Sequence, residues 1–237
     1  MKALAVLHDF CSAPGLVGDA LTDLGWEVET VTIVSPERFA NPGVEFTFPS
    51  HEPYDLLVPF GAPWSVYDHE TIGSWVQPEL AWLADAVADD TPVLGVCFGG
   101  QLLAQALGGT VQLGEVAEIG WHAVESDRPD IVPAGPFFQW HYDRFTLPPG
   151  AVSVARNAAT EQAFVHGRSM GVQFHPELTP DILAGWLDMG GHDKARTLGI
   201  DPADLAAETA ERVERSRTRT RTLVEGYLEH VFDPPRT

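Results

Sequence analysis

The stretch that most constrains the fold is residues 92–101, which read Pro-Val-Leu-Gly-Val-Cys-Phe-Gly-Gly-Gln. Residues 92–96 form an apolar, β-branched run after a polar segment, a pattern that predicts a buried strand. Residues 101–107 follow the pattern of a helix, which two glycines end. Cys97 stands between the two elements. The chain must therefore turn sharply from a strand into a helix, with a thiol at the turn.

Two glycines make this turn feasible and suggest what the thiol does. Gly95 and Gly99 stand two positions before and after Cys97, where larger side chains would prevent a sharp turn from closing. Free N–H groups at the start of the helix favour the thiolate over the thiol. The pattern predicts a nucleophile elbow, and the alternative is a buried structural cysteine. A histidine and a carboxylate elsewhere in the chain would favour the nucleophile.

The composition narrows the class of protein and its partners. The 237 residues suffice for one large α/β domain, and 34 acidic against 14 basic residues give a net charge of −20. Such a surface repels phosphate backbones and anionic membranes, so we expect neither nucleic acid nor a membrane as a partner. The only cysteines are Cys11 and Cys97, and no apolar run approaches the roughly 20 residues of a membrane helix. The N-terminus lacks a full signal-peptide core, so we expect a cytoplasmic protein in a reducing compartment.

Strand and helix candidates alternate along the first hundred residues. This order predicts an α/β fold with a mostly parallel central sheet and helices on both faces. Ligands of such sheets bind beyond the carboxyl ends of the strands, which is where the elbow places Cys97. Residues 35–54 contain four prolines and predict an irregular connection. The strand candidates are residues 3–7, 27–34, 55–59 and 92–96, and the helix candidates are residues 16–24, 72–88 and 101–107.

The pattern changes after residue 110. Short strand candidates without a strong helix predict a small antiparallel section, over residues 116–125, 151–156, 162–166 and 169–174. From residue 180 the chain is helical again, and residues 201–231 predict a long helix with Asp201 as N-cap and Pro202 in its first turn. We therefore expect a main domain over residues 1–190. Residues 191–237 are expected to form a helical C-terminal extension packed on the same domain.

Five arginines crowd residues 212–221, with glutamates around them. The simpler interpretation is a helix face held by ion pairs. The alternative is a docking surface for another protein, because Leu223, Tyr227 and Val231 follow at helical spacing.

A His-Pro-Glu segment supplies the partners that Cys97 needs. Val172 and Phe174 are typical of a strand, so His175 falls at a strand's carboxyl end. Pro176 keeps His175 extended, and residues two apart in an extended chain project to the same side. Glu177 can therefore bind one ring nitrogen of His175 and leave the other to face the thiol. This is the order of nucleophile, base and orienting carboxylate in a catalytic triad, whereas a surface turn is the alternative for the tripeptide alone.

Together these motifs resemble the class I, triad-type glutamine amidotransferases. Gly95-Val-Cys-Phe-Gly-Gly-Gln101 and Phe174-His-Pro-Glu177 carry the resemblance. Phe60-Gly-Ala-Pro-Trp-Ser-Val66 and Gln139-Trp-His-Tyr-Asp143 are similar to two further segments of the glutaminase domain of GMP synthase. The resemblance covers roughly residues 1–185 in the family's order, and it implies a flavodoxin-like fold.

The resemblance implies a role for each matching residue. Cys97 would attack the side-chain amide of glutamine to form a γ-glutamyl thioester, His175 would protonate the departing ammonia and then activate water, and Glu177 would orient His175. The oxyanion would be bound by the N–H of Phe98 and by the loop at Gly61 and Ala62. Residues near the bound glutamine would be Gln101, His141 and Asp143, although a structural pair is the alternative for the last two. No cofactor is implied.

The resemblance leaves the biological reaction open. Glutaminases of this family usually pass ammonia to a synthetase, and the last fifty residues offer no phosphate-binding loop, so we expect the synthetase to be a separate polypeptide. A free-standing hydrolase of γ-glutamyl compounds is the alternative among enzymes. A catalytically idle binding subunit is the alternative outside enzymes, and the intact Cys–His–Glu set argues against it. Self-association into a homodimer stays open.

Two smaller expectations complete the sequence analysis. The nine histidines lack the spacing of metal motifs, and Asp68-His-Glu70 and His192-Asp193 fit solvated loops, so we expect no metal site. Ala62 replaces the family's second loop glycine, and its N–H can serve as a donor only at negative φ. Because Pro63 and Trp64 also restrict the loop, we expect its donor to rest turned away until a partner binds.

Overall fold

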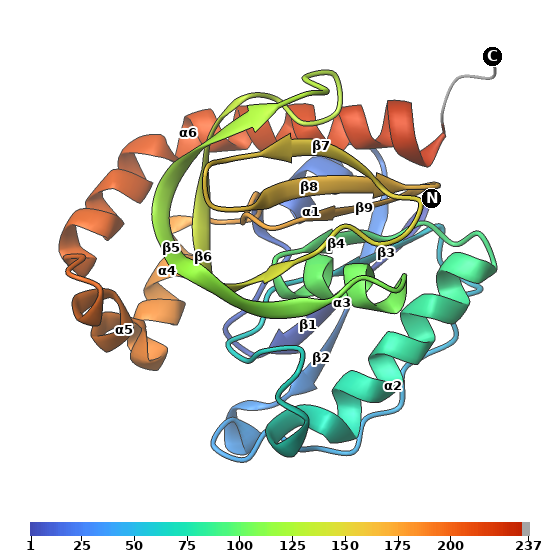
Figure 1. The fold of residues 1–237 in the computed structure, drawn as a ribbon, viewed down its shortest axis with the longest axis horizontal. Helices are drawn as coiled ribbons and strands as arrows, with labels where there is room; N and C mark the ends of the chain where they lie inside the picture. Colours follow the sequence, from blue (N-terminus) through green and yellow to red (C-terminus); the bar gives the residue numbers. More distant parts are fainter. Residues whose placement is uncertain (234–237) are drawn as a thin grey trace.

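The computed structural model describes residues 1–233, and its first half is a parallel sheet (Figure 1). The strands are β1 (Lys2–Asp9), β2 (Glu27–Val34) and β3 (Leu56–Pro59), in the order β2-β1-β3. An isolated parallel bridge from Leu57 to Val93 leads on to β4 (Leu94–Val96), which pairs in parallel with β9 (Ser169–Val172). The predicted parallel sheet is therefore present, and the elbow strand lies inside it.

The second half of the sheet is antiparallel and larger than the sequence predicts. From β9 the order runs β8, β7, β5, β6, and these strands are β5 (Val111–Ser126), β6 (Gly135–Phe145), β7 (Val152–Arg156) and β8 (Glu161–His166). The sheet is thus mixed, and its antiparallel section extends beyond the predicted one by one strand. The missed strand is β6, whose inward residues Gln139, His141 and Asp143 are polar while Trp140 and Tyr142 are more exposed. This inversion hides the alternation by which a strand is recognised.

Helices cover both faces of the parallel sheet, as the α/β prediction requires (Figure 1). Alternate residues of β1 enter two different cores, Ala3, Ala5 and Leu7 in one and Leu4 and Val6 in the other. The first core is closed by α1 (Gly15–Asp23) and α6 (Pro202–Tyr227), and the second by α2 (His69–Ala88) and α3 (Phe98–Ala106). Because both faces of β1 are buried, its sequence is a continuous apolar run.

Several helix boundaries differ from the predicted ones. Helix α2 begins at His69, because the side chain of Asp68 accepts a hydrogen bond from the N–H of Thr71, and it continues through Pro78. The interpretation of Asp68-His-Glu70 as a loop was therefore wrong. His192 and Asp193 likewise begin α5 (His192–Thr197). The remaining helical segments are α4 (Pro180–Trp186), a 3₁₀ turn (Pro36–Arg38) and two π-helical turns (Leu187–Gly191 and Leu228–Phe232).

The C-terminal helix packs on the same chain. Asp201 and Pro202 occupy the predicted N-cap and first-turn positions of α6. Arg217 and Arg221 pair with Asp19 and Asp23 of α1 at 2.7 and 3.4 Å. The apolar residues that suggested a docking surface are buried in the first core, so that interpretation was wrong for Leu223, Tyr227 and Val231.

Candidate active site

Cys97 stands at the turn between β4 and α3, where the backbone is forced into an uncommon conformation. Its φ is 51° and its ψ is −109°, and its N–H donates to the carbonyl of Val172 at 2.8 Å. A Cβ added at Gly99 would lie 2.0 Å from the carbonyl oxygen of Pro59, and one at Gly95 would lie 2.5 Å from that of Gly99. Both predicted glycines are thus required by close backbone approach, and the helix starts immediately after the cysteine.

His175 and Glu177 meet as the extended His-Pro-Glu geometry predicts. The Nδ1 of His175 lies 2.7 Å from Oε1 of Glu177, and both side chains are buried. The main chain is held as well, since the N–H of His175 donates to the carbonyl of Phe138 at 2.8 Å. The edge of Trp186 packs on the imidazole at 4.7 Å between ring centroids. The other ring nitrogen, Nε2, is buried without a hydrogen-bond partner among the described residues and is free to act.

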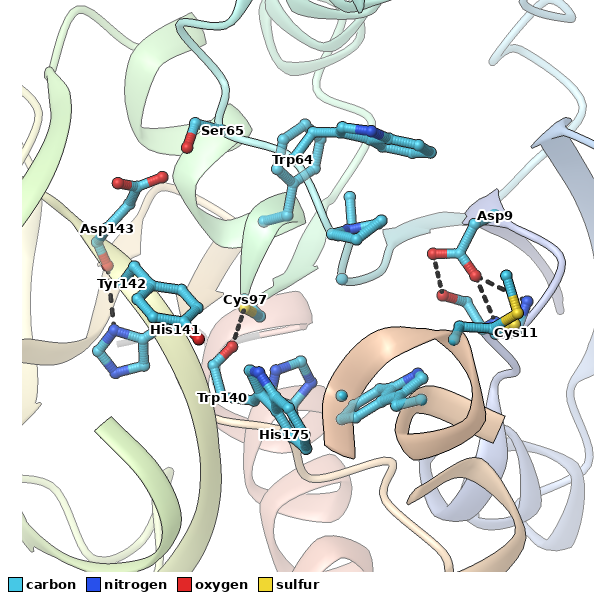
Figure 2. Close-up of a pocket in the computed structure, with 18 of the residues that line it drawn as sticks. Asp9, Cys11, Trp64, Ser65, Cys97, Trp140, His141, Tyr142, Asp143 and His175 are labelled. Atoms are coloured by element: carbon cyan, nitrogen blue, oxygen red, sulfur yellow. Dashed lines mark hydrogen bonds between the residues drawn. The ribbon is translucent and has the colours of Figure 1, made fainter. Parts of the chain in front are cut away.

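The electrostatics of the histidine favour its protonated form. Burial alone lowers the pKa of His175, but the Cys97 sulfur and the Glu177 carboxylate outweigh it and raise the pKa well above its ordinary value. Cys97 and His175 both line one cavity of about 140 Å³ (Figure 2). The arrangement can hold a thiolate next to an imidazolium, which is the reactive state of a cysteine nucleophile.

Two unpaired backbone donors line the same cavity. Phe98 is the first residue of α3, so its N–H has no acceptor within the helix. Ala62 lies in the loop after β3, and within residues 1–233 its N–H has no hydrogen-bond acceptor. The only residues other than glycine with positive φ in the described part of the chain are Asp90 and Cys97, so Ala62 has the backbone conformation that its N–H needs. The two groups can bind a negatively charged oxygen.

The cavity extends to both sides of Cys97 (Figure 2). On one side lie Ser65, His141 and Asp143, and on the other lie Asp9 and Cys11. The hydroxyl of Tyr67 donates to the Asp143 carboxylate at 2.7 Å. The side-chain amide of Gln101 donates to the Asp143 carbonyl at 3.3 Å. All the predicted site residues therefore line the cavity, apart from Glu177, which lies behind His175: Gly61, Ala62, Cys97, Phe98, Gln101, His141, Asp143 and His175.

Comparison with known proteins agrees with this geometry. A family model described as glutamine amidotransferase class-I matches residues 11–183. The chain belongs to this family. This class I glutamine amidotransferase is 27% identical to a glutamine amidotransferase from Thermotoga maritima. The crystal structure of that protein superposes on this chain with a TM-score of 0.81, over 97% of this chain and 98% of that one. A glutamine amidotransferase from Methylobacillus flagellatus, 24% identical over 96% of this chain and 94% of its own, has the same fold with a TM-score of 0.82.

Curated relatives of this glutamine amidotransferase carry two kinds of name. One is a GMP synthase (glutamine-hydrolyzing) from Aeropyrum pernix, 36% identical over 52% of this chain and 26% of its own length. Another is a gamma-glutamyl-L-1-hydroxyisopropylamide hydrolase from Pseudomonas sp., 34% identical over 75% of this chain and 62% of its own. The chain therefore spans 26% of the length of the first of these relatives and 62% of the length of the second.

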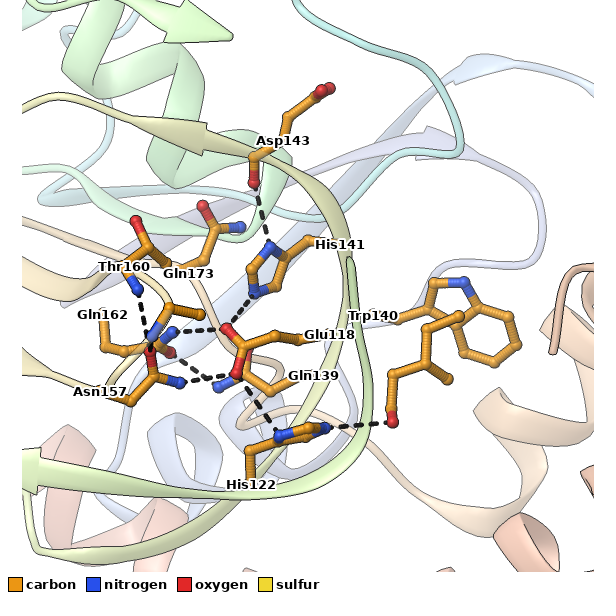
Figure 3. A network of polar contacts seen from close by, with 12 residues as sticks. Glu118, His122, Gln139, Trp140, His141, Asp143, Asn157, Thr160, Gln162 and Gln173 are labelled. Carbon is orange, nitrogen blue, oxygen red and sulfur yellow. Dashed lines mark hydrogen bonds and ion pairs between the residues drawn. The ribbon is translucent and has the colours of Figure 1, made fainter. Parts of the chain in front are cut away.

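His141 of the amidotransferase belongs mainly to a polar network beside the cavity (Figure 3). Its Nδ1 lies 3.0 Å from the Asp143 carbonyl, and its Nε2 lies 3.2 Å from the carboxylate of Glu118. The side-chain amides of Asn157 and Gln162 donate to the same carboxylate at 2.7 and 3.2 Å. His141 and Asp143 are thus not a side-chain pair, and Glu118 is a buried partner that the sequence did not reveal.

Several wall residues of the amidotransferase cavity were missed by sequence reasoning. Asp9 and Cys11 follow the carboxyl end of β1, and the rule that ligands bind beyond strand ends could have indicated them. Trp140, Trp186 and Lys194 come from β6, α4 and α5, and no sequence signal brings them to the site. A search of residues 1–233 finds no group of three or more histidine, cysteine, aspartate or glutamate side chains that could hold a metal ion. No described helix is both long and apolar enough to cross a membrane.

Proposed function

We propose that this chain hydrolyses the side-chain amide of glutamine through a thioester on Cys97. The observation that carries the proposal is the buried His175 ring, in the cavity that contains the elbow cysteine. One ring nitrogen is held by Glu177 at 2.7 Å, and the other has no hydrogen-bond partner within residues 1–233. The thiolate attacks the amide carbon and forms a C–S bond, and the tetrahedral oxygen binds the N–H groups of Ala62 and Phe98. Protonation of nitrogen by His175 breaks the C–N bond and releases ammonia.

The second half of the proposed reaction reverses the role of the histidine. Neutral His175 takes a proton from water, the hydroxide attacks the thioester carbon, and the C–S bond breaks to release glutamate and the thiolate. The α-amino and carboxylate groups of the substrate lie on the polar side of the cavity, near Gln101 and Asp143. His141 supports this wall through the Asp143 carbonyl.

The ammonia is proposed to pass to a synthetase on another polypeptide. The relatives named GMP synthase (glutamine-hydrolyzing) support a synthetase as the acceptor of the ammonia. We place the reaction in a reducing compartment such as the cytoplasm, since both Cys11 and Cys97 are free thiols.

A second candidate function rests on the cavity beyond the nucleophile. Ammonia needs little space, yet the cavity continues past Cys97 to Asp9 and Cys11 and includes the apolar walls of Trp186 and Met189 (Figure 2). This space fits an organic substituent on the amide nitrogen. The relative named as a γ-glutamyl-L-1-hydroxyisopropylamide hydrolase supports a free-standing hydrolase of substituted γ-glutamyl amides.

One set of assays tests both functions and the idle binding subunit. The purified chain is supplied with glutamine or with γ-glutamyl isopropylamide, and glutamate, ammonia and amine are measured. Release of ammonia from glutamine supports the glutaminase, and a preference for the substituted amide supports the hydrolase. Neither product, with or without cell extract, would favour the idle subunit. The Cys97→Ser variant is the control for each substrate.

Covalent labelling tests the assignment of the nucleophile. A diazo-ketone analogue of glutamine is expected to alkylate Cys97 and to spare Cys11, as mapped by peptide mass spectrometry. Burial is the main cause that raises the pKa of Cys11 to about 11, and Asp9 and Asp188 add to it, so this thiol stays protonated at neutral pH. Equal labelling of both cysteines, or labelling of Cys97 only after denaturation, would contradict the assignment.

A further inference from the structure

A histidine and a glutamate form a fully buried pair behind the loop that contains Ala62. His8 at the end of β1 and Glu79 of α2 are both 0% exposed, and neither lines the cavity. The Nε2 of His8 lies 3.1 and 3.2 Å from the two carboxylate oxygens of Glu79. Burying two charges costs several kcal/mol, and well-packed apolar residues in their place are often neutral or stabilising. The fold alone therefore does not explain why this pair is present.

The other nitrogen of His8 reaches the loop. Its Nδ1 lies 3.1 Å from the carbonyl oxygen of Gly61. Because both neighbours are acceptors, the ring donates to both only as an imidazolium. Burial lowers the pKa of His8, but the charge and hydrogen bond of Glu79 outweigh it and the pKa is raised. Trp75 stacks on the ring at 5.6 Å and the edge of Phe98 contacts it at 4.8 Å, so the imidazole has little freedom.

Hydrogen bonds hold three groups of the loop before Ala62. The N–H of Phe60 donates to the Val6 carbonyl at 3.0 Å, and the Phe60 carbonyl accepts from the N–H of Gly99 at 3.0 Å. The Gly61 carbonyl is held by His8. The next donor is the N–H of Ala62, which is unpaired within the described residues. The segment is therefore anchored at the N–H and the carbonyl of Phe60 and at the carbonyl of Gly61, and it presents the N–H of Ala62.

Peptide geometry connects the histidine to that free donor. No peptide bond in the described chain is cis, so the Gly61 carbonyl and the Ala62 N–H belong to one trans plane and point in opposite directions. His8 lies on the side away from the cavity. The loop lies close to the reacting groups, since a Cβ at Gly61 would lie 3.0 Å from Cε1 of His175 and 4.0 Å from Cβ of Cys97. A carbonyl fixed toward His8 thus directs the Ala62 N–H toward the reacting groups.

We propose that His8 and Glu79 are positioning residues that lock the Gly61–Ala62 peptide so that its N–H serves as an oxyanion donor in the isolated chain. The pair touches no substrate and acts through the loop. The inference rests on the proposed amide hydrolysis and deepens it. It is an alternative to the expectation of a donor that stays turned away until a partner binds.

A double substitution tests the lock without leaving a buried charge unpaired. The variant His8→Phe/Glu79→Leu keeps apolar volume and removes both charges, but it leaves the buried Gly61 carbonyl without a donor, which favours reorientation of the peptide. We expect kcat for glutamine hydrolysis to fall on the order of 10²-fold, as when an oxyanion donor is lost. KM and the rate at which iodoacetamide alkylates Cys97 should stay within roughly threefold, because displacement at carbon develops no oxyanion.

Two matched variants separate positioning from general damage. In His8→Asn/Glu79→Leu, the amide nitrogen takes the place of the ring Nδ1 and can again donate to Gly61, so kcat should recover by about tenfold or more. Tyr227→Phe removes another buried donor, whose hydroxyl bonds the Arg168 carbonyl at 3.1 Å in a different core. Its kcat should equal that of the unmodified chain.

The outcomes distinguish this inference from the proposed function. Absence of amide hydrolysis by the unmodified chain would end the proposed function itself. If the unmodified chain is active, an unchanged kcat in His8→Phe/Glu79→Leu overturns the lock. The lock is also overturned if this variant loses glutamine hydrolysis and alkylation of Cys97 to the same extent. If the double variant does not fold, Glu79→Gln replaces it. This variant leaves the His8 ring neutral with one proton, so the charge-assisted hydrogen bond to Gly61 is lost. The kcat should then fall about tenfold, while the rate at which iodoacetamide alkylates Cys97 stays unchanged. An unchanged kcat in Glu79→Gln then overturns the lock.

Discussion

At the scale of single residues, the site depends on a cysteine in a conformation that few side chains adopt. A φ of 51° is costly for a residue other than glycine, and it persists only where the surroundings enforce it. Here the N–H of Cys97 is bound to Val172, and the glycines around it allow the backbones to touch. The strained backbone of Cys97 thereby fixes the thiol relative to His175, and Glu177 fixes the ring of His175.

The residues of the triad should differ in their contributions. His175→Ala removes the acid, the base and the activator of the thiol together, so kcat should fall by more than the roughly 10²–10⁴-fold typical of acid–base catalysis alone. Glu177→Ala removes only the orienting contact at 2.7 Å and should cost less. Steady-state hydrolysis of glutamine measures both. A Glu177→Ala enzyme slower than His175→Ala would reverse the assigned roles.

The raised pKa of His175 predicts a shift in the pH profile. In the proposed reaction the imidazolium delivers the proton to the leaving nitrogen, so kcat/KM should fall only as the pH rises through a pKa above the ordinary histidine range. A neighbouring carboxylate favours the charged ring, and Glu177→Gln removes that charge. The pKa then falls, and the alkaline limb of kcat/KM should move to lower pH. If the alkaline limb of kcat/KM stays at the same pH in Glu177→Gln, Glu177 does not stabilise the imidazolium.

Sequence reasoning reaches those residues whose geometry is local. The contact of His175 with Glu177 follows from an extended chain, and the glycines around Cys97 follow from a sharp turn. Asp9 could have been found from the end of β1. Trp186 could not, because its contact with His175 depends on how α4 packs against β6.

At the scale of elements, one buried glutamate joins three antiparallel strands (Figure 3). Glu118 of β5 is 4% exposed and accepts from Gln162 of β8 and from Asn157 after β7, while His141 of β6 faces it at 3.2 Å. Burial raises the pKa of Glu118, but contacts with His141 outweigh it, so the pKa is lowered and the group stays a carboxylate. Two amide donors and a facing imidazole thus converge on one carboxylate, and the wall of the cavity depends on it.

Exchange of this carboxylate for an amide should weaken the antiparallel section. Glu118→Gln keeps the size but replaces an acceptor with a donor that faces the amide donors of Asn157 and Gln162. An unsatisfied buried group costs about 1–3 kcal/mol, so the free energy of unfolding should fall by that amount in urea titrations. KM should rise as well, because His141 supports Asp143. Asp127→Asn, in an exposed ion pair with Arg156, is the control and should change stability little.

The same network explains which elements the sequence predicts. Helices α1 and α6 and strand β2 have clear periodicity or end signals, and their predicted positions are close to the observed ones. Strand β6 has no such signal, because its polar residues point inward, where His141 faces Glu118, and its aromatic residues line the cavity. Patterns of apolar residues identify strands that form a core, and β6 forms a site instead.

At the scale of the whole molecule, the two cores meet through β1, and α6 completes one of them. Tyr227 and Leu223 are fully buried between α1 and the sheet, although they lie far along the chain from the strands that they cover. The α/β class could be predicted from alternating elements. The size of the antiparallel section could not, because its register is set by contacts such as those of Glu118 rather than by local pattern.

Helix α6 should therefore be required for the fold rather than for binding a partner. Leu223→Ala removes a fully buried side chain and should lower the free energy of unfolding by about 2–5 kcal/mol. Arg215→Ala, at an exposed position of the same helix, should change it by less than about 0.5 kcal/mol. Thermal unfolding of both variants measures the difference. If Leu223→Ala leaves the free energy of unfolding unchanged, α6 is held by its ion pairs with α1 instead.

One contact of α6 has a consequence for the timing of activity during protein synthesis. The buried hydroxyl of Thr220 donates to the carbonyl of Pro176 at 2.6 Å, so the helix supports the peptide between His175 and Glu177 from behind. A ribosome makes His175 and Glu177 before it makes that support. A nascent chain that stops short of α6 would hold the thiol and the histidine without this support, so the proposed hydrolysis should begin only after α6 has packed.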